Sequence, residues 1–168
     1  LKWDERSRVL ADQLMSELKA ELGQALQQGG AVAAITVCKS RAPEIAARLS
    51  ASSGAEVKRT AIRLRNPANA PDDLERAVMQ GFAAELSGAS PVASVLPEAI
   101  FESRSAQGTE RRYLRAIVMQ PVCLACHGTT LAPEIATAIA REYPQDAATG
   151  FETGQLRGAV TVRWPATR

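Results

Sequence analysis

The sequence contains one compact group of reactive side chains, at residues 123–128. Cys123, Cys126 and His127 form the pattern Cys-x-x-Cys-His. Two thiols three positions apart can form thioethers to the two vinyl groups of one porphyrin, and the histidine that follows can then bind the iron. His127 is also the only histidine of the chain. The pattern therefore predicts one covalently attached haem c per chain, with His127 as an iron ligand.

Two other uses of the same pattern compete with haem attachment. A Cys-x-x-Cys pair can be a redox-active dithiol, which normally lies at a strand-to-helix turn inside a βαβ unit. A zinc site needs four ligands, and Cys38 together with the motif would supply three cysteines and one histidine. The usual second Cys-x-x-Cys or His pair of a zinc site is missing from the sequence. A dithiol oxidoreductase and a zinc site are therefore the minor alternatives.

A single haem in a chain with one histidine must take its sixth iron ligand from another residue type, or have none. Cys38 is the third cysteine and stays unpaired if the other two form thioethers. A lone cysteine is otherwise usually a small buried apolar residue. The candidates for the sixth ligand are Cys38, Met15, Met79 and Met119. The residues by themselves leave this choice open.

Basic residues gather in the middle of the sequence. Four of them run into two asparagines: Lys58, Arg59, Arg63, Arg65, Asn66 and Asn69. Forked guanidinium donors suit the two propionate carboxylates of a haem, although a solvent-exposed strand edge would give the same pattern. A weaker candidate for the same role is Tyr113 with its neighbours Arg111, Arg112 and Arg115.

The composition limits the class of protein. With 168 residues, 46% apolar and 23% charged, the chain is long enough for about one globular domain and is neither disordered nor collagen-like. A formal charge of +2 gives no single-sign field for nucleic acid, and no apolar run is long enough to span a bilayer. The sequence begins at Leu1, so a leader or membrane anchor could precede it. No second histidine or coupled acid–base pair accompanies the motif, so we expect no enzyme activity.

Apolar periodicity and turn residues outline the elements that must position these side chains. Helices are predicted at 3–28, 31–39, 43–50, 72–88 and 133–143. Strands are predicted at 56–64, 92–102, 111–119 and 155–164, with the middle two forming a hairpin. The pair Gly29-Gly30 is expected to end the first helix. Helices that lead into antiparallel strands indicate an α+β fold.

Seven stretches of the sequence are similar to one known family. They are residues 34–38, 42–46, 57–60, 65–71, 123–128, 143–144 and 154–159. The most specific is Arg-Asn-Pro-x-Asn-x-Pro at 65–71, since generic cytochromes have no role for it. The chain resembles a family of single-haem c-type domains with a PAS-like fold, whose members occur alone or as extracytoplasmic sensor domains.

The resemblance implies a PAS-like antiparallel sheet flanked by helices, with a long N-terminal helix. Residues 1–28 would form that helix and 29–168 the haem domain, as one globular unit. Haem would attach at Cys123 and Cys126, with His127 and Cys38 as axial ligands. The expected function is periplasmic sensing of redox state or of CO or NO, reported to a signalling output domain. The alternative is a low-potential electron carrier that meets a redox partner protein.

Overall fold

A computed structural model describes residues 1–88 and 95–167 of the chain. The helices among them are α1 (Trp3–Ser53), η1 (Pro67–Asn69), α2 (Asp73–Ser87), η2 (Pro121–Cys123), α3 (Leu124–His127) and α4 (Pro133–Glu142). The strands are β1 (Glu56–Thr60), β2 (Glu98–Ser105), β3 (Gly108–Val118) and β4 (Leu156–Thr167). They form one antiparallel sheet in the order β1-β4-β3-β2. The α+β class is confirmed, and the architecture is consistent with a PAS-like fold.

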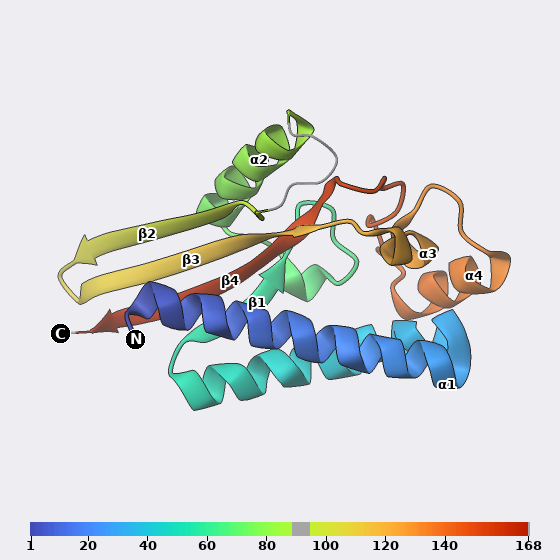
Figure 1. Ribbon diagram of the computed structural model, residues 1–168, viewed down its shortest axis with the longest axis horizontal. Helices are drawn as coiled ribbons and strands as arrows, with labels where there is room; N and C mark the ends of the chain where they lie inside the picture. The colour runs from blue at the N-terminus through green and yellow to red at the C-terminus, as the bar shows by residue number, and fades with distance from the viewer. Residues whose placement is uncertain (89–94, 168) are drawn as a thin grey trace.

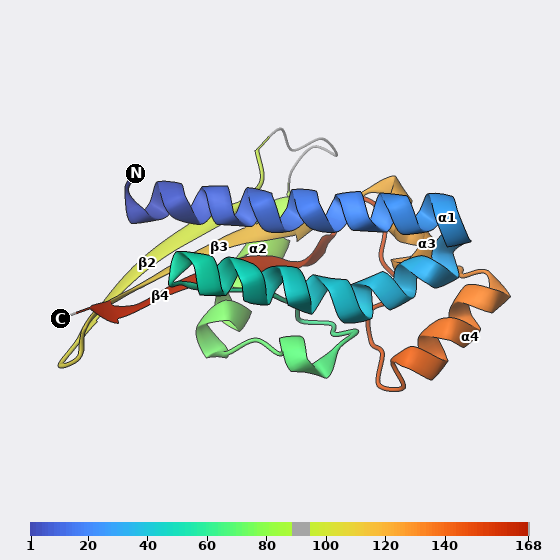
Figure 2. The ribbon, with the colours of Figure 1, turned by 90° about the horizontal axis from the view of Figure 1, so that it is seen from below.

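The long helix α1 is a hairpin rather than a straight rod. Gly30 has φ 74° and ψ −167°, a conformation that glycine adopts without strain, and the chain reverses there. Figures 1 and 2 show the two halves lying side by side and running in opposite directions. Arg41 in the second half pairs with Glu21 in the first at 2.9 Å, and Arg48 pairs with Glu17. The predicted end of the first helix at Gly29-Gly30 is confirmed.

The prediction of two short helices at 31–39 and 43–50 is wrong, because the second half of α1 continues through Pro43 to Ser53. Proline inside a helix removes one backbone hydrogen bond and usually breaks or kinks the helix. Here Ala42, Ile45 and Leu49 are buried around it, and this packing maintains the helix. Among the described residues, no helix has both the length and the apolarity needed to cross a bilayer.

The two faces of the sheet carry different helices (Figure 1). Side chains alternate between the faces along a strand, so neighbours such as Tyr113 and Leu114 point in opposite directions. Tyr113 packs with residues of the α1 hairpin, including Leu14 and Leu49. Leu114 packs with Met79 and Phe82 of α2. The first helix of the chain and the sheet therefore share one core.

All four strands differ from the predicted bounds, and the differences are largest at β1 and β2. β1 ends at Thr60 instead of Leu64, because the chain then turns toward the loop at 146–149, where Ala147 N–H donates to Leu64 C=O at 2.8 Å. β4 approaches β1 closely at Gly158, where a Cβ atom would lie 2.3 Å from the Thr60 carbonyl oxygen. β2 begins at Glu98, and positions 92–94 of the predicted strand lie outside the described residues.

Candidate functional site

A cavity of about 460 Å³ lies between the α1 hairpin and the sheet, next to α3. We call it the α1 cavity. Apolar residues from both halves of the hairpin line it, among them Leu18, Leu22 and Ile35. Cys123, Cys126 and His127 also line it, so the motif faces the cavity. Its size is in the range of small-molecule and cofactor sites, which are mostly apolar with a few placed polar groups.

The imidazole of His127 is held in the form that binds a metal. Its Nδ1 lies 2.7 Å from the carbonyl oxygen of Ala148, which can only accept, so Nδ1 carries the proton and Nε2 keeps a lone pair. Burial, reinforced by the positive charges of Arg157 and Arg65, lowers the pKa of His127 to about 3. The ring is therefore neutral at neutral pH, with its orientation fixed by the Ala148 carbonyl.

Arg65 fastens the motif to the loop that holds His127. Its Nε donates to Asp146 at 2.9 Å, and one terminal nitrogen donates to the carbonyls of Cys126 at 2.6 Å and Ala148 at 3.2 Å. The Ala148 carbonyl is the same group that accepts from His127. Arg65 is 8% exposed, and these contacts use its Nε and one terminal nitrogen. Arg65 therefore positions the motif.

The four candidates for a second metal ligand separate into two groups. Cys38, on the second half of α1, and Met15, on the first half, both line the α1 cavity. Met79 is buried against the opposite face of the sheet, and Met119 packs with Phe151; neither lines the cavity. Burial raises the pKa of the Cys38 thiol, while the nearby charges of Arg59, Arg65 and Arg157 act in the other direction.

The lining of the α1 cavity is strongly cationic. It includes Lys19, Lys58, Arg59, Arg65 and Arg157, and no aspartate or glutamate. The side chain of Arg59 makes no hydrogen bond or ion pair within residues 1–88 and 95–167, and burial lowers its pKa. Burial, with repulsion from Arg65 and Arg59, lowers the pKa of Arg157 to about 10. An anionic ligand would therefore fit this lining.

Most of the residues predicted from the sequence meet in this cavity: Cys38, Arg59, Arg65, Asn66, Asn69, Cys123, Cys126 and His127. The asparagines shape its border, since Asn66 Oδ1 accepts from the N–H of Ala68 and the Asn69 carbonyl accepts from Thr60. Tyr113 does not reach the cavity. It lies in the core beneath α1, and its hydroxyl donates to Glu98 at 2.8 Å.

Two lining residues, Tyr143 and Arg157, were missed as site residues by sequence reasoning. Regular alternation along β4 assigns Arg157 to a solvent-exposed face. The pairing with β3 is irregular there, because Ile117 pairs with Gly158 and the next residue, Val118, pairs with Leu156. Arg157 is the extra residue of this bulge, and bulges re-aim side chains. The periodicity of the sequence carries no signal for such an irregularity.

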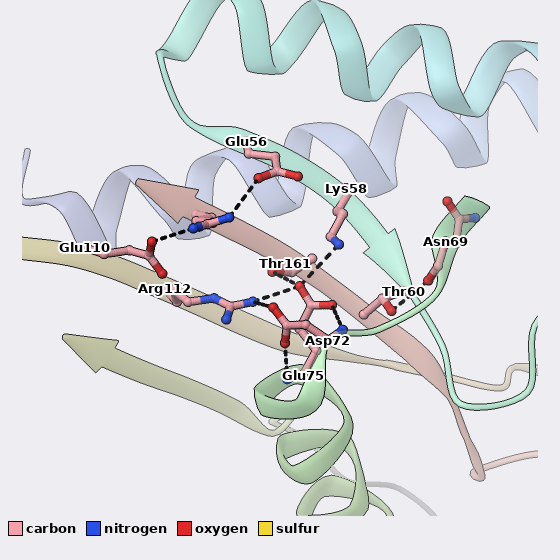
Figure 3. Close-up of polar contacts among 10 residues, drawn as sticks. Glu56, Lys58, Thr60, Asn69, Asp72, Glu75, Glu110, Arg112 and Thr161 are labelled. Carbon is pink, nitrogen blue, oxygen red and sulfur yellow. Dashed lines mark hydrogen bonds and ion pairs between the residues drawn. The ribbon is translucent and has the colours of Figure 1, made fainter. Parts of the chain in front are cut away.

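A second group of charges lies on the opposite face of the sheet, under the N-terminus of α2 (Figure 3). We call it the α2 cluster: Lys58, Asp72, Glu75, Arg112 and Thr161. One terminal nitrogen of Arg112 donates to Asp72 at 2.7 Å and to Glu75 at 2.9 Å. Lys58 Nζ lies 3.4 Å from the Glu75 carboxylate, which is almost fully buried. Two cations thus face two carboxylates here.

The minor alternatives for the motif find little support in this geometry. All three cysteines are free, and burial raises the pKa of Cys126, whereas reactive dithiols have a cysteine with a lowered pKa. In the part of the chain that the structure describes, no group of three or more His, Cys, Asp or Glu side chains is arranged to hold a metal ion.

Fold and site together define an α+β domain in which a Cys-x-x-Cys-His motif borders an apolar, cationic cavity. A family model described as Tll0287-like matches residues 2–165, so the chain belongs to the Tll0287-like family. Its fold is similar to that in the crystal structure of the cyanobacterial heme-protein Tll0287, with a TM-score of 0.66 and 26% sequence identity. The match covers 100% of this chain and 99% of that one. No curated protein sequence matches the chain.

Proposed function

We propose that this protein binds one haem c in the α1 cavity, through thioethers from Cys123 and Cys126 and with Nε2 of His127 as an axial ligand. The observation that carries the proposal is a Cys-x-x-Cys-His motif facing a 460 Å³ apolar cavity with a neutral, oriented histidine. The similar solved structure is that of a heme-protein, which supports it. When bound, haem supplies a one-electron couple and a coordination site for small ligands.

We assign the second axial position to Cys38. Cys38 and Met15 are the two candidates that line the cavity, and the three arginines near Cys38 favour an anionic sulfur over a neutral thioether. Because burial raises the pKa of the free thiol, Cys38 must release a proton when it binds a metal. A thiolate ligand favours ferric iron, and each tenfold preference lowers a one-electron potential by about 59 mV.

The position of Cys38 favours a sensor over a simple electron carrier. Cys38 belongs to the α1 hairpin, which also covers the sheet and provides much of the cavity wall. Gain or loss of a bond at its sulfur would therefore act directly on this hairpin. We propose that the protein senses redox state or a diatomic gas such as CO or NO in the periplasm and reports to an output domain or a partner protein. We assign it no catalytic role.

The first experiment tests haem attachment. The chain is produced with a c-type maturation system, and the purified protein is extracted with acidified acetone. We expect the haem to stay on the protein, at one per chain. A Cys123→Ser, Cys126→Ser variant serves as the control and should release any pigment. Free extraction of the wild-type pigment, or zinc in place of iron, would contradict the proposal.

The second experiment tests Cys38 and the sensing role. Cys38→Ala should change the ferric electron paramagnetic resonance spectrum and raise the midpoint potential, whereas Met15→Leu should leave both unchanged. Unchanged spectra in Cys38→Ala would exclude thiolate ligation. CO is then added to the reduced wild-type protein. A shift of the Soret band supports the sensor, and a spectrum that does not respond favours an electron carrier with two persistent ligands.

A further inference from the structure

We propose that Arg59 and Arg157 form a carboxylate-binding pair in the α1 cavity, which takes the two propionate groups of its ligand. This deepens the proposed function and rests on it, because haem is the ligand that would bring two carboxylates to this cavity. The proposal is specific about which cations do this. Sequence reasoning selected Arg59 and Arg65 for the task, and the structure points to a different pair.

Arg65 and Lys58 already have partners within the protein. Arg65 is engaged by Asp146 and by two backbone carbonyls. Lys58 lies on the edge strand β1, and its side chain points to the buried Glu75 carboxylate of the α2 cluster (Figure 3). Arg65 cannot turn to a ligand without breaking its ion pair with Asp146, and the Lys58 ammonium lies with Glu75 on the opposite face of the sheet. These two cations are therefore assigned to the protein's own structure.

Arg59 and Arg157 lack such partners. Within the described residues, the Arg59 guanidinium has no hydrogen bond or ion pair. Arg157 donates to the carbonyl of Arg63 at 3.1 Å and packs 5.5 Å from the ring centroid of Phe151, but meets no carboxylate. Cations shielded from water are normally paired, and here two half-buried guanidinium groups repel each other across one cavity. Two carboxylates on a bound ligand would remove both the desolvation cost and the repulsion.

The strands place the two guanidinium groups at the same cavity. Arg59 lies on β1 and pairs in register with Val160 of β4, while Arg157 occupies the bulge of β4 a few residues away. Both side chains leave the sheet on the side of the α1 hairpin, near Cys38, whose thiol feels the charge of each. A ligand whose carboxylates lie on these arginines would have its other end among Leu18, Leu22 and the motif cysteines.

The first test uses the haem-loaded protein. Arg59→Met and Arg157→Met remove one positive charge each while keeping most of the side-chain volume. The control is Arg141→Met, an exposed arginine of α4 outside the cavity lining. Loss of a nearby cation should shift the ratio of reduced to oxidised protein at a fixed potential about tenfold toward oxidised, or ~59 mV in midpoint potential. Resonance Raman propionate-bending bands should shift in the two variants and not in the control.

The second test does not depend on thioether attachment. The full chain, produced without maturation, is titrated by fluorescence with metal-free protoporphyrin IX and with its dimethyl ester, which lacks the free carboxylates. We expect the wild type and Arg141→Met to bind the diacid at least tenfold more tightly than the ester. In the Arg59→Met, Arg157→Met double variant this preference should disappear.

The two tests separate failure of the pair from failure of the proposed function. If haem is not attached but the diacid preference depends on Arg59 and Arg157, the cavity binds a dicarboxylate and the haem assignment is wrong. If haem is attached but the variants keep the wild-type potential, Raman bands and diacid preference, the carboxylate-binding pair is wrong. If the diacid preference is lost in Arg65→Met but kept in the Arg59→Met, Arg157→Met double variant, the role returns to Arg65 and the proposal is overturned.

Discussion

The two faces of the sheet handle buried positive charge in opposite ways. In the α2 cluster, the Arg112 side chain is only 11% exposed and is matched by Asp72 and Glu75 of its own chain. In the α1 cavity, Arg59 and Arg157 are half-buried and have no carboxylate of the described residues within ion-pair distance. The fold shows that the sequence can provide counter-ions for buried arginines where they support structure.

The face of the sheet whose arginines have no carboxylate partner is therefore informative about function. Burial of a charged side chain without a partner costs several kcal/mol. Such a side chain is therefore retained where ligand binding or a reaction requires its charge. In the described structure, Arg112 bonds to two carboxylates, whereas Arg59 and Arg157, beside the Cys-x-x-Cys-His motif, have no ion pair. Charge balance distinguishes the structural face from the ligand-binding face.

The largest effect is expected in the α2 cluster. Glu75→Gln removes a buried carboxylate from Arg112 and Lys58, and should lower the free energy of unfolding by about 3 kcal/mol. Urea unfolding followed by circular dichroism measures this loss, which should be equal with and without haem. A Glu75→Met, Arg112→Met double variant, in which both charges are removed, should regain most of the stability. A loss below about 1 kcal/mol would show that this network contributes little.

Removal of the Arg65 side-chain contacts should give the next largest loss of stability. Arg65→Met removes the ion pair with Asp146 and one donor from each of the carbonyls of Cys126 and Ala148, and should destabilise the protein by about 2 kcal/mol. Because the same carbonyl of Ala148 orients His127, the ferric spectrum should also broaden or shift. Arg65→Lys, which keeps the charge but not the fork, should restore part of the stability and less of the spectrum. Arg141→Met controls for loss of a single positive charge. An unaltered spectrum in Arg65→Met would contradict its positioning role.

Much of the site could be predicted because its chemistry is local in sequence. Cys123, Cys126 and His127 are adjacent, and Arg65, Asn66 and Asn69 form a turn whose residue types specify its conformation. The helix α2 begins where its capping residue Asp72 indicates, with Glu75 completing the capping box. These features follow from neighbouring residues, so the structure places them as expected.

The remaining features depend on long-range packing. Without tertiary packing, Pro43 would break the helix. Burial of the neighbouring residues of α1 maintains it. The direction of Arg157 follows from a bulge in the pairing of β3 with β4. Tyr113 is flanked by arginines, as a ligand-binding residue would be. The alternation of side chains along β3 nevertheless directs it into the core. Neither the partner strand nor its register can be read from these residues alone.

Arg59→Met is expected to change the stability of the haem-free and the haem-loaded protein in opposite directions. Arg59→Met in the haem-free protein removes a buried, unpaired cation, so stability should stay the same or rise by about 1 kcal/mol. In the haem-loaded protein the same variant should lose stability, because a carboxylate of the ligand then loses its partner. Thermal unfolding of both forms measures this. Arg112→Met, by contrast, should destabilise both forms. Destabilisation of the haem-free protein by Arg59→Met would mean that Arg59 has a structural role.

The smallest effect on stability is expected for an ion pair at the surface. It gives a reference against which the effects in the α2 cluster and the α1 cavity can be compared. Glu98 accepts from Arg8 at 2.7 Å and from the Tyr113 hydroxyl at 2.8 Å. The Arg8 hydrogen bond, supported by Tyr113 and opposed by partial burial, lowers the pKa of Glu98 in the folded protein. The ion pair is largely solvated, so it should contribute little to stability.

A carboxyl whose pKa is lower in the folded than in the unfolded chain stabilises the folded state when it is ionised. This stabilisation is fully present above the unfolded pKa of about 4.3 and is lost as the pH falls through the lower folded pKa. The difference in unfolding free energy between wild type and Glu98→Gln should therefore be constant from about pH 8 to pH 6 and shrink below about pH 4. Glu134→Gln, an exposed carboxylate of α4 with no ion pair in the described structure, controls for the loss of one charge. A difference that grew on acidification would show that Glu98 is held protonated, against the contact geometry.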